Sequence, residues 1–150
     1  MSAVPVRRED FTLAHRLRVR WSEVDMQHVV FNANYLMYFD VAIAEYWRAI
    51  GSGRERELAE AYMRLYTVKS VVEYHAPARY DEEIEVCARV TRFGRSSMPF
   101  ALGIWRGGDH LCSGELVYVH ADPATRKSVP IPQLLRDAVL AYERVQPAPG

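Results

Sequence analysis

The segment DMQHVVFNANYLMYFDVAIAEYW, residues 25–47, decides the fold of this chain. It places Asp25 in a short polar loop, directly before a long run of apolar residues. We expect a helix that begins within Asn32–Asn34, capped by one of these two asparagine side chains, and ends near Ile50 with Gly51 as a left-handed stop. A helix N-terminus offers free N–H groups and a partial positive charge. A carboxylate beside it is therefore a place where chemistry on a carbonyl group can be built.

The predicted helix is apolar around almost its whole circumference. Only Asp40, Glu45 and Arg48 interrupt the apolar residues between Tyr35 and Ile50. A helix of this kind has to be enclosed by the rest of the protein, because a surface helix carries a polar face.

Strand patterns supply the enclosing layer. Between Leu13 and Trp21 apolar residues alternate with arginines, which predicts a strand with one basic, solvated face. Four further strands are expected at residues 67–75, 83–93, 98–105 and 110–121, bounded by the turn-forming stretches APARYDE, GRSS, RGGD and DPATRK. The Gly107-Gly108 pair suits a tight hairpin between the last two.

Two further helices complete the prediction. RERELAEAYMRLY is helical in composition, and an amphipathic helix is expected over residues 133–144, after Pro130 and Pro132. The pattern predicts an α+β fold in one domain over residues 1–150. A five-stranded antiparallel sheet would wrap around the long central helix, with a C-terminal helix following.

Composition excludes several classes of partner. Lys plus Arg and Asp plus Glu both number 19, so no global field recruits nucleic acid or an anionic membrane. We expect no membrane span, no secretory segment and no disulfide framework from the two cysteines, with the cytoplasm as the default location. The expected partner is a small molecule or another copy of the chain.

The stretch VRWSEVDMQHVVFNANYLMYFD, residues 19–40, resembles the signature of the hotdog-fold acyl-CoA thioesterases of the 4-hydroxybenzoyl-CoA thioesterase group. In that group a strand ends in an aromatic residue, an acidic loop follows, and a hydrophobic pair precedes the Asn-Tyr that opens the long helix. VTRFGRSSMPF, LCSGELVYVHAD and VPIP also match in kind and order, so the resemblance covers most of the chain.

The resemblance implies a catalytic pair. Asp25 falls where the group has its catalytic carboxylate, a nucleophile on the thioester carbonyl or a base for the attacking water. Asn32 falls where the group uses a backbone N–H as oxyanion donor. Spacing alone also allows a plainer role, in which Asp25 only accepts hydrogen bonds from the turn before the helix.

His28 departs from the group, where glycine is usual three residues after the acid. Glycine there would permit a close approach of backbone to substrate, whereas an imidazole fills space and titrates near neutral pH. His28 is an auxiliary acid or base, a polar pocket wall or an ordinary loop histidine. We favour the last two over the first.

Several residues are candidates for substrate binding. Trp21, Phe31, Tyr35 and Tyr38 are available to line an acyl pocket, although most aromatic residues serve as core. The basic turn is the expected site for the phosphates of coenzyme A, with Arg126 and Lys127 as additions; its candidate residues are Arg92, Arg95, Ser96 and Ser97. Asp40 is a second choice of catalytic acid, and Glu45 is expected to be structural.

No metal or cofactor is expected beyond the coenzyme A of the substrate, because neither zinc-ligand spacing nor a glycine-rich phosphate loop occurs. The resemblance implies that the substrate is an acyl-CoA or an acyl carrier protein thioester. An exposed sheet edge predicts a homodimer or homotetramer.

Two alternatives remain at this stage. The first is a hotdog dehydratase or hydratase, whose H-F-P-x-x-P and D-x-N-P-x-H runs this chain lacks. The second is a non-catalytic acyl-CoA-binding protein.

Overall fold

The computed structural model describes residues 5–149. Two short 3-10 turns lie at Arg8–Asp10 and Trp21–Glu23. The helices and strands along the chain are β1 (Leu13–Arg18), α1 (Asn34–Ile50), α2 (Glu55–Tyr62), β2 (Leu65–Tyr74), β3 (Glu83–Val90), β4 (Ser97–Arg106), β5 (Asp109–His120) and α3 (Gln133–Tyr142). No helix within this part of the chain is long and apolar enough to cross a membrane.

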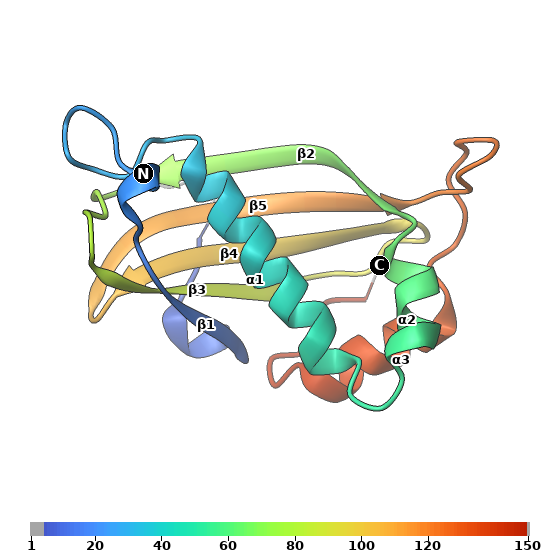
Figure 1. The fold of residues 1–150 in the computed structure, drawn as a ribbon. Helices are drawn as coiled ribbons and strands as arrows, with labels where there is room; N and C mark the ends of the chain where they lie inside the picture. The colour runs from blue at the N-terminus through green and yellow to red at the C-terminus, as the bar shows by residue number, and fades with distance from the viewer. Residues whose placement is uncertain (1–4, 150) are drawn as a thin grey trace.

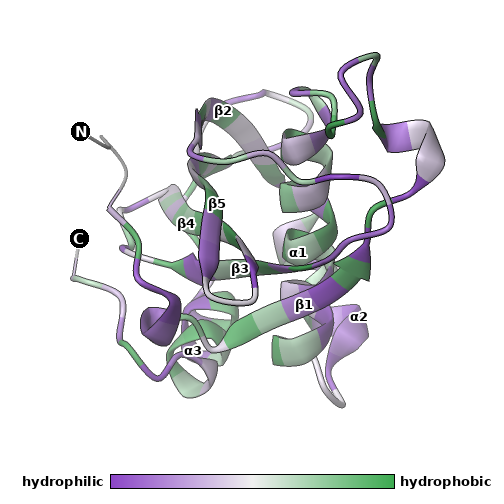
Figure 2. Cartoon of the chain, turned by 90° about the vertical axis from the view of Figure 1, so that its left-hand side faces the viewer, coloured by the Kyte–Doolittle hydropathy of each residue, from purple (hydrophilic) through white to green (hydrophobic). Residues whose placement is uncertain are grey.

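The strands form one antiparallel sheet of five strands in the order β1-β3-β4-β5-β2, and α1 lies across one of its faces (Figure 1). This is the predicted α+β hotdog architecture. The hairpin between β4 and β5 turns at Gly107, whose φ of 58° lies in the left-handed region that favours glycine. β1 ends earlier than predicted, because residues 21–23 leave the strand as a 3-10 turn. Figure 2 shows both hydrophobic and hydrophilic residues along β1.

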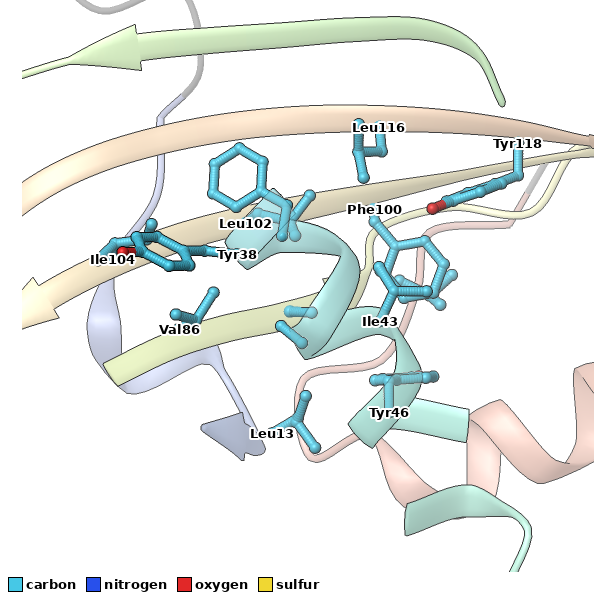
Figure 3. Close-up of a cluster of buried hydrophobic side chains, with 14 of the residues drawn as sticks. Leu13, Tyr38, Ile43, Tyr46, Val86, Phe100, Leu102, Ile104, Leu116 and Tyr118 are labelled. Carbon is cyan, nitrogen blue, oxygen red and sulfur yellow. The ribbon is translucent and has the colours of Figure 1, made fainter. Parts of the chain in front are cut away.

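The core lies between α1 and the sheet. Tyr38 and Tyr46 on α1 point towards the sheet residues Phe100, Leu102 and Ile104 (Figure 3). Gly114 on β5 allows α1 to approach closely, since a Cβ atom there would lie 2.3 Å from Cε2 of Phe39. Helix α1 therefore rests directly on the backbone of the sheet at this point.

Both predicted ends of α1 are placed correctly, but the predicted caps are wrong. The N-cap residue is Ala33, and no side chain caps the helix. The Asn34 amide instead donates to the backbone carbonyl of Glu23 at 2.9 Å, a competing acceptor on the preceding turn. Gly51 has φ of −89°, outside the left-handed region. A Cβ at Gly51 would lie 2.8 Å from the Trp47 carbonyl oxygen, so contact and not handedness favours glycine there.

The prediction that α1 is enclosed on all sides is wrong for the single chain. Leu36, Met37 and Val41 are exposed on the helix face turned away from the sheet. The physical reason is that one sheet covers only one side of a helix. The remaining apolar face would need a second layer, which a single copy of the chain does not supply.

Candidate active site

The loop that carries Asp25 is closed on itself. The backbone N–H of Asp25 donates to the Val29 carbonyl at 2.8 Å, and that of His28 donates to the Asp25 carbonyl at 3.0 Å. One carboxylate oxygen of Asp25 accepts the backbone N–H of Gln27 at 2.8 Å. The other has no hydrogen-bond partner among residues 5–149. The plainer turn-stabilising role thus occupies one oxygen and leaves the second for a ligand.

A cavity of about 300 Å³ lies where this loop meets the end of β2. The loop is held there by the Val30 N–H, which donates to the Ala78 carbonyl at 2.8 Å. The residues that line the cavity come from the loop, the start of α1 and the end of β2: Asp25, Gln27, Val29, Val30, Asn32, Tyr35, Tyr74, His75, Ala76 and Pro77. The structure therefore brings the predicted residues Asp25, Asn32 and Tyr35 together in one cavity.

Two unpaired amides lie directly before α1, and one of the two residues, Asn32, lines this cavity. The N–H of Phe31 donates to the Glu23 carbonyl, and the N–H of Asn34 donates to the Phe31 carbonyl. Asn32 and Ala33 lie between Phe31 and Asn34 in the sequence, and their backbone N–H groups have no acceptor within the described chain. Such amides at a helix N-terminus suit a negatively charged oxygen.

Tyr35 forms the buried wall of the cavity. Its hydroxyl accepts the backbone N–H of Ala78 at 3.0 Å, and its ring packs edge-on against Tyr74 at 5.4 Å. Burial raises the pKa of Tyr35, so its hydroxyl stays protonated and keeps a proton to donate.

Glu23 clamps the two ends of the loop together, a role that we did not predict from sequence. Its buried carboxylate accepts hydrogen bonds from the Arg20 backbone N–H at 2.7 Å and from the Tyr38 hydroxyl at 2.9 Å. Its backbone carbonyl accepts hydrogen bonds from the Phe31 backbone N–H and from the Asn34 side-chain amide. Burial alone would raise the Glu23 pKa, but hydrogen bonds from Arg20 and Tyr38 outweigh it and lower that pKa. The only sequence signal is an acidic residue three positions after Arg20 and just before the loop.

His28, Trp21 and Phe31 do not line the cavity. His28 is exposed with φ of 64°, in the left-handed region that glycine adopts without a steric cost. Backbone conformation alone would therefore favour glycine at this position, without any close approach to substrate. Trp21 is 69% exposed and packs against Tyr80, and Phe31 is also exposed.

The predicted coenzyme A rim lies at the opposite end of the sheet. Arg106, at the end of β4, donates to the Pro77 carbonyl beside the Asp25 cavity. Ser97 begins the same strand, and a strand of 10 residues spans ~30 Å. Arg126 lines a separate cleft of about 730 Å³ at that far end, together with Tyr66 and Val68 of β2. One chain therefore does not bring the residues of the basic turn, Arg92, Arg95, Ser96 and Ser97, to Asp25.

The two carboxylates on α1 behave differently. Asp40 lies on the exposed face, although partial desolvation raises the pKa of its carboxyl group. Glu45 pairs with Arg48 one turn away, which agrees with its predicted structural role. Neither lines the cavity that contains Asp25.

A sheet wrapped around one long helix, with an acidic loop and free amides at the start of that helix, defines a thioesterase of the hotdog fold. Residues 19–139 match the thioesterase-like superfamily, and the chain belongs to this family of thioester hydrolases. It is 28% identical to the acyl-CoA thioester hydrolase YbgC of Escherichia coli O6:H1, over 78% of this chain and 87% of that protein.

Solved structures show the same relationship. The PA5185 protein of Pseudomonas aeruginosa PAO1 is 30% identical, with a TM-score of 0.76 over 91% of this chain and 94% of that one. A thioesterase of Thermus thermophilus, solved with coenzyme A and zinc, is 26% identical, with a TM-score of 0.79 over 90% and 96% of the two chains.

Proposed function

We propose that this protein hydrolyses acyl-CoA thioesters, with Asp25 as the catalytic carboxylate. The observation that carries the proposal is the shared cavity: Asp25, with one free oxygen, and Asn32, with an unpaired N–H, line the same space. The E. coli relative is named as an acyl-CoA thioester hydrolase, and the T. thermophilus relative binds coenzyme A, which supports this substrate class.

Two routes use the same atoms. In the first, the free oxygen of Asp25 attacks the thioester carbonyl carbon, the C–S bond breaks, thiolate leaves, and water then cleaves the mixed anhydride. In the second, Asp25 takes a proton from a water molecule, the resulting hydroxide attacks the carbonyl carbon, and thiolate leaves. After a single turnover in water enriched in oxygen-18, label in the Asp25 carboxyl group identifies the first route, with water attacking Cγ of Asp25 in the anhydride. Label in the released acid alone fits the second route and also attack of water on the acyl carbon of the anhydride.

Both routes place negative charge on the thioester oxygen. The Asn32 N–H at the start of α1 is the proposed donor to this oxyanion, assisted by the partial positive charge of the helix terminus. Because the donor belongs to the main chain, substitution of the Asn32 side chain tests it poorly.

A second copy of the chain would complete the site. β2 is an edge strand with exposed Tyr66 and Val68 at one end and Tyr74 at the other. If two copies pair their β2 strands antiparallel about a twofold axis, the Arg126 end of one copy lies beside the Asp25 end of its partner. The same arrangement would extend the sheet and bring the basic rim to the thioester.

A thiol-release assay tests the proposal. Wild-type protein is screened against aromatic and aliphatic thioesters on coenzyme A and on acyl carrier protein, and the best substrate is then used for Asp25→Asn. We expect a fall in kcat of at least about 100-fold. Asp137→Asn, on the exposed face of α3, is the matched control and should keep the wild-type rate. Full activity in Asp25→Asn would overturn the assignment.

A further inference from the structure

Tyr74 reaches from the end of β2 to the first turn before α1. Its hydroxyl donates to the backbone carbonyl of Asn32 at 3.2 Å, a contact between residues 42 positions apart. Its ring packs edge-on against Tyr35, and both side chains line the cavity that contains Asp25. None of the roles proposed above uses the Tyr74 hydroxyl.

We infer that the Ala33 N–H is a second donor to the oxyanion, beside that of Asn32, and that Tyr74 is a positioning residue that orients and polarises this Ala33 amide. The inference rests on the proposed function, because it concerns the same cavity. The Asn32 carbonyl and the Ala33 N–H belong to one peptide unit, so a hydrogen bond to the carbonyl fixes the plane in which that N–H points. It also withdraws electrons from the amide, which makes the N–H a stronger donor.

The surrounding contacts leave this peptide dependent on Tyr74. The neighbouring unit, Phe31–Asn32, is anchored because its carbonyl accepts the Asn34 N–H at 2.8 Å. The Asn32 carbonyl accepts one other bond, from the Tyr35 N–H at 3.3 Å. This bond and the 3.2 Å bond from Tyr74 are both long for their types, so neither alone fixes the peptide and the loss of Tyr74 leaves one weak bond. Burial raises the pKa of Tyr74, so its hydroxyl remains a proton donor near neutral pH.

A purely structural role for the hydroxyl is less well supported. Tyr74 is about half exposed, at 54%, and removal of its hydroxyl leaves the ring contact with Tyr35 in place. The start of α1 is also held by the Asn34 side chain on Glu23. The hydroxyl should therefore affect the reaction more than the fold.

Tyr74→Phe in the full chain, with the best acyl-CoA, is the test. We expect kcat to fall about 3-fold to 10-fold, the effect of one lost hydrogen bond, with KM within about 2-fold of wild type and an unchanged melting temperature. Tyr62→Phe is the matched control, because Tyr62 stacks on Trp47 and does not line the cavity. It should match wild type in all three quantities.

A spectroscopic readout separates positioning from packing. A ketone analogue of the substrate, with a methylene in place of the sulfur and carbon-13 at the carbonyl, reports polarisation through its chemical shift. The bound shift should move less far from its free value in Tyr74→Phe than in wild type.

Equal kcat and equal shifts in the two proteins would overturn the inference. So would a loss of kcat that is matched by a lower melting temperature. If Asp25→Asn is inactive while Tyr74→Phe equals wild type, the proposed function stands and only this inference fails.

Discussion

The Tyr38 hydroxyl donates to the Glu23 carboxylate at 2.9 Å and ties α1 to the 3-10 turn that precedes the Asp25 loop. The same Glu23 holds Phe31 and Asn34 through its backbone carbonyl. Both ends of the loop thus depend on one buried acidic residue. Glu23 and Tyr38 lie on either side of the Asp25 loop in the sequence. The hydrogen bond between them therefore limits the movement of Asp25 relative to the free amides.

Glu23→Gln should lower the free energy of unfolding by about 1–2 kcal/mol near neutral pH, because the charged acceptor for Arg20 and Tyr38 is lost. The folded-state pKa of Glu23 is lowered, so its contribution is present above the ordinary glutamate pKa of 4.5 and disappears as pH falls through the folded value. Urea unfolding of both proteins from about pH 7 down to about pH 3 measures this.

Glu45→Gln is the control for that experiment. Glu45 also pairs with an arginine, Arg48, but it does so at the surface of α1, so its loss should cost under about 0.5 kcal/mol. A stability difference for Glu23→Gln that stays constant across the acid range would show that the carboxylate charge is irrelevant.

His28→Gly should stabilise the protein by about 1 kcal/mol and leave kcat within about 3-fold of wild type, because glycine adopts the observed φ of 64° without steric cost. Met26→Gly, at an exposed position of the same loop without positive φ, should instead reduce stability slightly. Thermal melts and the thiol-release assay check both variants. A 100-fold loss of kcat in His28→Gly would identify the imidazole as an acid or base.

Periodicity was enough to predict the elements but not their surroundings. The alternation that begins at Leu13 predicts β1, and the apolar run that follows Asn34 predicts α1, because these patterns are local to the chain. The exposure of Met37 and Val41 depends on how much of the helix one sheet covers, which no local pattern contains.

The candidate site also contains residues that the sequence predicts and one that it does not. Asp25 and Asn32 are near in sequence and lie in one cavity, so their motif predicts their proximity. Tyr74 enters the cavity from a strand 42 residues beyond Asn32, and it has no sequence signal. The distance between the basic turn and Asp25 depends on the direction in which β4 runs. That direction belongs to the topology of the sheet, and neither motif contains it.

Gly114→Ala should destabilise the protein by about 1–3 kcal/mol, because the added methyl group would lie 2.3 Å from the Phe39 ring and 2.9 Å from the Val71 carbonyl. Gly108→Ala is the matched control: no atom lies within 4 Å of a Cβ there, and its φ is not positive. Urea unfolding compares the two. Equal stability of both variants would mean that α1 and the sheet move apart without cost.

Complementation tests whether two copies share each site. Asp25→Asn supplies an intact rim without the acid, and Arg126→Ala supplies the acid without part of the rim, so each protein alone should have reduced activity. In a mixed dimer one of the two sites regains both residues. Equal mixing makes half of the dimers mixed, and activity should rise to about a quarter of wild type after subunit exchange.

Size-exclusion chromatography coupled to light scattering is the first control, and it should show that the two parents and their mixture are dimers or larger oligomers. Val68→Asp provides the second control, because a charge on the exposed β2 edge should prevent pairing of the two sheets. Recovery should then vanish when both parents carry Val68→Asp. Activity that stays at the sum of the separate parents, in a mixture shown to exchange subunits, would place the acid and its rim within one chain, in conflict with the ~30 Å that β4 puts between them.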